Sequence, residues 1–210
     1  MMEEEARAWF RRAHVPRETV ERMEAFAAFL RAENAKQNLV SEVSLAEIWR
    51  RHLLDSAQLL RFAPAPDGRW IDLGTGAGFP GLVVAALHNG PVTLVEERRL
   101  RVDFLRRAAE ILGVEVEIIG TRVERVPPRP FDVISARAFA PLPRLLDLGT
   151  RFSTTKTFWV LPKGKNAESE LEGLDSSWQG DFRLEPSLTD PQAKIIVATG
   201  VHRKAKRKSR

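Results

Sequence analysis

A glycine-rich stretch, IDLGTGAGFPG at residues 71–81, is the segment of this sequence best suited to bind a nucleotide. Gly74, Gly76 and Gly78 alternate along it, and glycine lets a ligand approach the backbone where a Cβ would block it. An acid, Glu96, follows 22 residues after Gly74 at the end of the apolar run VTLVE. An acid at this spacing bonds the hydroxyls of a ribose, which both NAD and S-adenosylmethionine carry.

Several features favour S-adenosylmethionine over NAD. Asp72 precedes the glycines by two residues, where its carboxylate would face a cationic amino acid but would repel a pyrophosphate. The chain contains no tyrosine, so the tyrosine–lysine pair of many hydride-transfer enzymes is missing. Of the two neighbouring acids, Glu96 is preferred over Glu97 as the ribose ligand because it ends the alternating run. We expect Asp72, the three glycines and Glu96 to bind the cofactor.

Further residues with chemical potential follow the later strands. Arg137 and Lys163 come just after the ends of two successive predicted strands, so we expect them at the mouth of the pocket, orienting a target nucleotide. Surface ion pairing is the alternative for Lys163. Phe139 is the best candidate for stacking on an RNA base. His52 and Asp55 share a helical face, but two ligands are too few for a metal, so a hydrogen bond within the helix packing is expected and no metal site is predicted.

The elements that position these residues follow from the change of period after the break APAPDG at residues 63–68. Apolar runs that predict strands alternate with helical segments, which indicates a parallel sheet with helices on both faces. The last two runs are separated by only five residues, so they should form an antiparallel hairpin. The predicted strands cover residues 69–74, 92–96, 114–119, 131–136, 157–162, 182–188 and 194–199, and the predicted helices start at 79 or cover 98–112, 142–152 and 166–175. The fold class is therefore α/β, a doubly wound, Rossmann-like class I methyltransferase sheet ending in an antiparallel hairpin.

The first part of the chain is predicted to be helical. Apolar residues recur at helical spacing from 16 to 38, and Ser44 with Glu47 forms the pattern of a capping box that opens a second helix. We divide the chain into an N-terminal helical extension packed on the core (1–64), a methyltransferase domain (65–202) and a basic tail (203–210).

Composition narrows the class of protein. Hydrophobic residues make up 43% and charged residues 29%, as in soluble globular proteins. No apolar run is long enough to span a membrane and no signal peptide is visible, so we expect a cytoplasmic location. The net charge of +5 comes from the tail RKAKRKSR, which we expect to be disordered and to add salt-dependent RNA affinity. The absence of cysteine excludes thiolate chemistry on a pyrimidine ring.

An ordered set of motifs covering about residues 35–200 is similar to one known family. These motifs are RHLLDSAQLL (51–60), IDLGTGAGFPGL (71–82), VTLVEERRLRVDFLRR (92–107), GTRVERV (120–126), FDVISARAFAPL (131–142) and WVLPKGKNAESEL (159–171). Together they closely resemble the bacterial small-subunit ribosomal RNA guanine-N7 methyltransferases, the glucose-inhibited division protein B family. The resemblance implies methyl transfer from S-adenosylmethionine to N7 of a guanine in 16S ribosomal RNA.

The resemblance also implies roles for individual residues. Gly74 and Phe79 would line the cofactor, Val123 and Glu124 would lie at its adenine, and Arg137 would border it. The partner would be 16S ribosomal RNA or the small ribosomal subunit, with no membrane involved, and we expect a monomer.

Three other functions remain open from the residues alone. Another RNA methyltransferase activity, on the ribose 2′-oxygen, would use the same cofactor pocket. An NAD-dependent oxidoreductase would need a proton-relay residue, and a non-enzymatic RNA-binding module would use only the basic tail. N7 methylation requires no base to remove a proton first, which agrees with the lack of an amine-gripping [DN]-P-P-[FY] motif after residues 131–136.

Overall fold

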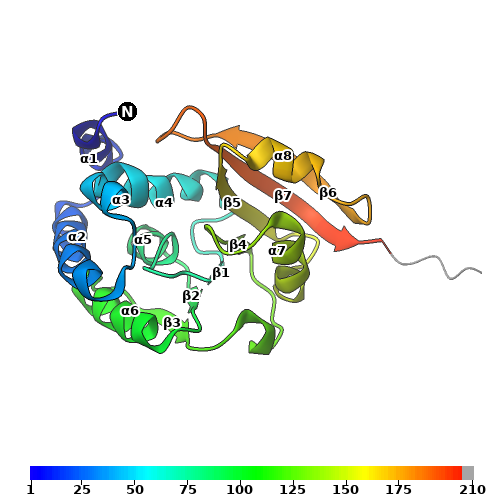
Figure 1. The fold of residues 1–210 in the computed structure, drawn as a ribbon, viewed down its shortest axis with the longest axis horizontal. Helices are drawn as coiled ribbons and strands as arrows, with labels where there is room; N and C mark the ends of the chain where they lie inside the picture. Colours follow the sequence, from blue (N-terminus) through cyan, green and yellow to red (C-terminus); the bar gives the residue numbers. More distant parts are fainter. Residues whose placement is uncertain (205–210) are drawn as a thin grey trace, which may run out of the picture.

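The structure is a computed structural model that describes residues 1–204 of the chain. A seven-stranded sheet forms its centre, in the order β3-β2-β1-β4-β5-β7-β6 (Figure 1). Strands β1 to β5 run parallel, whereas β7 pairs antiparallel with both β5 and β6. This confirms the predicted doubly wound sheet with a terminal hairpin. The strands are β1 Trp70–Leu73, β2 Val92–Val95, β3 Val116–Ile119, β4 Val133–Ser135, β5 Phe158–Gly164, β6 Trp178–Pro186 and β7 Lys194–Arg203.

Helices cover both faces of this sheet because successive strand residues point to opposite sides. Trp70 and Val133 pack into one core, formed with the N-terminal helices, α5 and α6. Ile71 and Ile134 pack into the other core, with α7 and α8. The helices before β1 are α1 Glu3–Arg12, α2 Arg17–Gln37, α3 Glu42–Ala46, the π-helix η1 Trp49–Leu54, α4 Asp55–Ala57 and the 3₁₀ helix η2 Gln58–Phe62; those after it are α5 Gly81–Leu87, α6 Arg99–Leu112, η3 Val123–Arg125, α7 Leu142–Gly149, η4 Thr150–Phe152 and α8 Ala167–Glu172.

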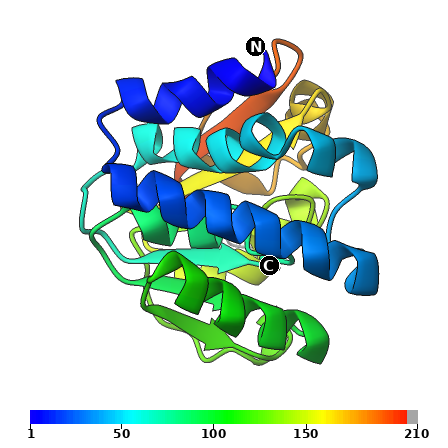
Figure 2. The same cartoon turned by 90° about the vertical axis from the view of Figure 1, so that its left-hand side faces the viewer.

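The N-terminal helices lie in front of the sheet as part of the first core, as Figure 2 shows. Phe29 of α2 stacks on Phe104 of α6, with ring centroids 5.2 Å apart. Phe10 of α1 meets Trp49 of η1 edge-on at 5.5 Å. The Phe10–Trp49 contact therefore holds the N-terminal helices together, and the Phe29–Phe104 contact fixes α2 to α6 within the first core.

Two local expectations differ from the structure. The second helix opens with Ser41, whose Oγ accepts a hydrogen bond from the backbone N of Ser44 at 3.3 Å, rather than with a Ser44–Glu47 capping box. Serine at position 41 offers the same capping chemistry one turn earlier. The last strand extends to Arg203, and Lys204 N donates to the backbone O of Ser177, so the first two residues of the predicted tail are ordered. The rest of that predicted disordered tail, residues 205–210, lies outside the described residues.

Candidate functional site

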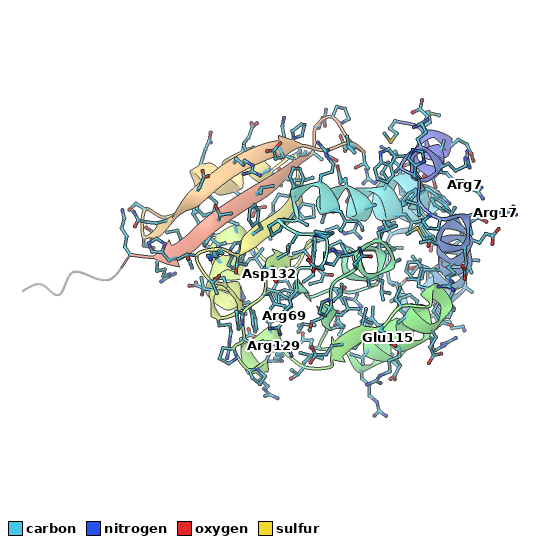
Figure 3. All side chains as sticks on the ribbon, turned by 180° about the vertical axis from the view of Figure 1, so that it is seen from behind. Arg7, Arg17, Arg69, Glu115, Arg129 and Asp132 are labelled. Carbon is cyan, nitrogen blue, oxygen red and sulfur yellow. The ribbon has the colours of Figure 1, made fainter. Side chains whose placement is uncertain are left out.

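The carboxyl ends of β1 and β4 form the centre of the candidate site. The chain leaves these neighbouring strands toward opposite faces of the sheet. Open α/β sheets bind ligands at such a point, where the strand order reverses. Arg69 and Asp132, which precede β1 and β4 and are labelled in Figure 3, mark the opposite edge of the sheet. The glycine loop follows β1 and the loop containing Arg137 follows β4, so the fold brings both predicted motifs together.

Two cavities open at the carboxyl ends of the strands. The smaller has a volume of about 380 Å³ and is lined by Gly74, Glu96 and the segment 121–124, among others. The larger, of about 810 Å³, is lined by residues from the N-terminal helices, the loop after β4, and the segment 187–195. Ala138, Phe139 and Ala140 line both cavities. A three-residue wall therefore separates a pocket of cofactor size from a second, larger one.

The three predicted glycines differ in what they do. Gly74 lines the smaller cavity with φ +66°, and a Cβ there would lie 2.1 Å from Cδ2 of Phe139. Gly78 faces the core instead, where a Cβ would lie 2.4 Å from Cδ1 of Leu82. Gly76 donates its backbone N–H to Oε2 of Glu96 at 3.1 Å. Only Gly74 reaches the cavity wall, while the other two shape the loop behind it.

Glu96 holds the glycine loop in place. Its side chain is buried, and its two carboxylate oxygens accept backbone N–H groups from Gly76 at 3.1 Å and Arg98 at 2.9 Å. Glu97 also lines the smaller cavity, but its carboxylate forms an exposed ion pair with Arg122 at 2.9 Å. Each oxygen of Glu96 keeps a free lone pair, so the carboxylate at the cavity wall has capacity to accept hydroxyl groups.

Val123 and Glu124 lie on the same smaller cavity, at the start of η3. Val123 is buried and presents an apolar surface, and Glu124 accepts a hydrogen bond from Arg144 at 3.2 Å. Leu148 of α7 also lines this cavity. Sequence reasoning missed Leu148, because a leucine on a helical face carries no signal that separates a cavity wall from ordinary core.

Asp72 does not line either cavity, contrary to the expectation that it faces the cofactor. It is fully buried, and its oxygens accept hydrogen bonds from Ser135 Oγ at 2.8 Å and from Gly81 N at 3.0 Å. Burial raises the pKa of Asp72 to about 6, although these hydrogen bonds oppose the shift. The carboxylate caps the start of α5 and ties β1 to β4 from behind the glycine loop.

Phe79 likewise lies away from both cavities. Its side chain is buried, stacks on the His52 ring with centroids 4.7 Å apart, and packs against Phe26 at 5.6 Å. The place beside the cofactor that the family resemblance implies for Phe79 stays a prediction, and its side chain does not supply a cavity wall. Phe79 instead anchors the glycine loop to the N-terminal helices.

Arg137 links the loop after β4 to the N-terminal helices. It donates to Nδ1 of His52 at 2.9 Å and to the backbone O of Arg51 at 3.0 Å, and it lies 3.5 Å from Oδ2 of Asp55. Its guanidinium also lies over the Phe79 ring, 5.2 Å from the centroid. His52 and Asp55 thus take part in packing hydrogen bonds, as expected, and both bond Arg137 rather than each other.

His52 is neutral in this arrangement. Its Nδ1 accepts from Arg137, which leaves the proton on Nε2. Burial, and then the charges of Arg137 and Arg51, lower the pKa of His52 to about 3. The imidazole is consequently a fixed acceptor for the guanidinium rather than an acid–base group near neutral pH.

Lys163 supports the far end of the loop after β4, the loop that contains Arg137. Its ammonium donates to the backbone O of Ala140 at 3.1 Å and to Oε2 of Glu170 at 2.8 Å. Glu170 also accepts from Leu142 N at 3.0 Å. With a side chain only 8% exposed, Lys163 forms a mostly buried ion pair rather than a surface one. It lines the larger cavity and fixes the wall that contains Phe139.

The β6–β7 connection closes the larger cavity against the N-terminal helices. Thr189 Oγ1 donates to Oδ1 of Asp55 at 2.8 Å, and Arg50 donates to the backbone O of Thr189 at 3.1 Å. Gln58 accepts from Leu188 N at 2.7 Å. Segments more than 120 residues apart thus meet across one cavity, and nothing in their local sequence indicates that pairing.

Within residues 1–204, no group of three or more His, Asp or Glu side chains is placed to hold a metal ion. In the same part of the chain, no helix combines the length and apolarity needed to cross a bilayer.

Solved structures share this fold. A ribosomal protein L11 methylase from Lactobacillus delbrueckii subsp. bulgaricus superposes with a TM-score of 0.54 at 17% identity, covering 71% of this chain and 77% of that one. MtNAS in complex with MTA and tNA gives a TM-score of 0.57 at 18% identity, covering 85% of this chain and 69% of that one. These similarities identify the sheet and its helices as the class I methyltransferase fold.

Sequence comparison identifies the family. The family model described as rRNA small subunit methyltransferase G (GidB) matches residues 19–192. A ribosomal RNA small subunit methyltransferase G from Zymomonas mobilis is 50% identical, covering 97% of this chain and 96% of the relative. The protein of the same name from Rhizorhabdus wittichii is 52% identical, covering 98% and 96%. With its glycine loop, acidic strand end and paired cavities, this chain therefore belongs to the rRNA small subunit methyltransferase G family.

Proposed function

We propose that this protein transfers a methyl group from S-adenosylmethionine to N7 of a guanine in 16S ribosomal RNA. The observation that carries the proposal is the pair of cavities separated only by residues 138–140. One cavity contains the glycine loop and an acid, and the other is large enough for a nucleotide. A group-transfer enzyme with two substrates requires adjoining cavities, because the reacting atoms must meet.

The smaller cavity fits the cofactor by its chemistry. Glu96 offers carboxylate lone pairs to ribose hydroxyls, Val123 and Leu148 offer apolar surface to a flat base, and the backbone of Gly74 allows close approach. Sequence reasoning assigned three of these four residues. The roles of Asp72, Gly76, Gly78 and Phe79 in this proposal are indirect, since they hold the loop that carries Gly74.

The larger cavity would receive the guanine, with Phe139 as the surface on which the base stacks. S-adenosylmethionine would supply the methyl group on a sulfonium: the lone pair of guanine N7 would form the new N–C bond while the S–C bond breaks and adenosylhomocysteine leaves, with no proton lost beforehand. No side chain therefore has to act as a base. Arg137 and Lys163 instead hold the wall between the substrates through their bonds to His52 and Ala140. They are positioning residues, and the rate enhancement is expected to come from alignment.

The proposal extends to the partner and the cellular setting. The substrate is 16S ribosomal RNA, alone or within the small subunit, which places the reaction in the cytoplasm. Since one chain supplies both cavities from its own residues, a monomer suffices.

Nucleoside mass analysis tests this function. Ribosomal RNA from a strain lacking the gene should lose one N7-methylguanosine, and purified protein with S-adenosylmethionine should restore it. A missing 2′-O-methylnucleoside, with N7-methylguanosine unchanged, would contradict the proposal and support ribose methylation instead. No change in any methylated nucleoside would exclude both activities.

A further inference from the structure

The charged groups of the larger cavity divide into those that the protein already uses and those that it leaves available. Arg137 is neutralised by Asp55, and Lys163 by Glu170, at 3.5 and 2.8 Å respectively. Both cations also hold backbone carbonyls within the cavity wall. These two residues, which the sequence analysis expected to orient a target nucleotide, thus already bond other groups of the protein.

Two further cations line the same cavity. Arg51 lies on η1, and its side chain is exposed, although its backbone O is fixed by Arg137 at 3.0 Å. Lys194 opens β7, where it lies opposite Pro186 and beside the bulge of β5 at Gly164. Among residues 1–204, neither Arg51 nor Lys194 forms a salt bridge. Their backbones lie in η1 and β7, while their charged groups stay outside the ion pairs of that part of the chain.

One carboxylate of the cavity also remains outside the ion pairs. Asp190 accepts the backbone N–H of Gln192 at 2.9 Å, and no cation of the described chain pairs with it. After the two internal ion pairs are set aside, the cavity keeps two positive groups and one negative group. A polyanion can therefore contact this cavity favourably only at Arg51 and Lys194.

We propose that Arg51 and Lys194 bind the backbone phosphates of the RNA strand that presents the target guanine. The inference rests on the proposed function and specifies which residues position the RNA. The two cations belong to elements far apart in the chain, η1 and β7, which approach each other through the bonds of Thr189 to Asp55 and Arg50. Phosphates on either side of an inserted nucleotide would then be held from two walls of the cavity.

The test measures methylation of undermethylated ribosomal RNA by Arg51→Gln, Lys194→Gln and the double variant, over a range of monovalent salt. Each lost phosphate contact should flatten the slope of log(1/KM) against log[salt] by about 0.7, the value for single-stranded RNA. The KM for RNA should rise roughly 2- to 30-fold in the double variant, as for two exposed ion pairs. The kcat and the affinity for adenosylhomocysteine should stay near wild type, since neither residue lines the smaller cavity.

Matched controls separate this effect from a general loss of charge. Arg31→Gln and Lys156→Gln remove exposed cations that line neither cavity, and Arg51→Lys keeps the charge. These three variants should keep the wild-type salt slope. An unchanged slope in the double variant, or an equal change in the two control variants, would overturn the proposal. If the wild type forms no N7-methylguanosine, the proposed function fails, whereas direct RNA binding against salt still decides the role of the two cations.

Discussion

Replacement of Glu96 by glutamine tests the cofactor site most directly. The carboxylate accepts N–H groups of Gly76 and Arg98 and lies 3.8 Å from the guanidinium of Arg101. Glutamine keeps one acceptor oxygen, but its amide NH₂ group would face a backbone N–H, that of Gly76 or Arg98, and two donors cannot bond each other. One charge-assisted hydrogen bond contributes about 1.5–3 kcal/mol, so the unliganded protein should lose about that much unfolding free energy.

The affinity for adenosylhomocysteine should fall as well. Loss of a charged hydrogen bond to a ribose hydroxyl predicts a Kd raised by roughly 10- to 150-fold at about 1.4 kcal/mol per tenfold change. Glu97→Gln is the matched control, because Glu97 lines the same cavity but directs its carboxylate to Arg122, in an ion pair that is half exposed and contributes at most about 1 kcal/mol. We expect that control to change the Kd less than about fivefold.

A ligand analogue separates the ribose contact from the bracing of the loop. Calorimetry would compare adenosylhomocysteine with its 2′-deoxy analogue in wild type and in Glu96→Gln. The wild type should lose about tenfold affinity for the analogue, whereas the variant should bind both ligands equally, as a double-mutant cycle requires for a direct contact. An analogue penalty that persists in Glu96→Gln would refute the assignment, and a large loss in Glu97→Gln would show that the strand end is misassigned by one residue.

Three further predictions concern the wall and its supports. Gly74→Ala should weaken adenosylhomocysteine binding because its Cβ would meet the Phe139 ring; calorimetry should show a smaller loss in the Gly74→Ala, Phe139→Ala double variant than additivity predicts, and simple additivity would contradict this packing. Since the pKa of His52 is lowered to about 3, folding excludes a proton and stability is lost as pH falls from about 6.5 toward 3. His52→Asn, which keeps an acceptor, should therefore reduce the difference in urea-measured unfolding free energy between pH 7 and 4.5 by about 2 kcal/mol, and an unchanged difference would mean that His52 is protonated in the folded state. Lys163→Met should raise the KM for RNA while leaving the Kd for adenosylhomocysteine within about threefold, and a tenfold rise of that Kd would contradict the separation of the two cavities.

The sequence predicted the fold well because the burial of apolar side chains determined both the spacing of apolar residues in the sequence and the arrangement of strands and helices. Every predicted strand is present, with ends shifted by up to a few residues, since buried parallel strands require apolar runs and crossover helices require amphipathic ones. The region from Glu42 to Phe62 was less predictable. Helical spacing alone does not distinguish a continuous helix from the α, π and 3₁₀ segments that the structure contains.

Site residues were predictable where the local chain determines their direction. Strand alternation selected Glu96 over Glu97, and the structure gives the two acids the different surroundings that this choice implies. Asp72 was assigned to the ligand because it lies near the end of β1, but the direction of its side chain depends on α5, whose first backbone N–H it accepts. The partners of Arg137 lie 82 to 86 residues earlier in the chain, a separation at which spacing carries no information about contact.

The arrangement of the two cavities along the chain has a consequence for biosynthesis. Residues from Gly74 to Leu148 supply the whole lining of the smaller cavity, whereas the larger one combines Ser44 to Asp55 with Ser187 to Ile195. On a translating ribosome, the cofactor pocket is therefore complete in sequence while the last quarter of the chain is still to be made. The larger cavity, which we propose receives the RNA, is completed only when the final hairpin reaches the first helices. A nascent or truncated chain that lacks this hairpin would lack the wall formed by residues 187–195, so on the proposed function methylation would begin only after the start of β7 has emerged.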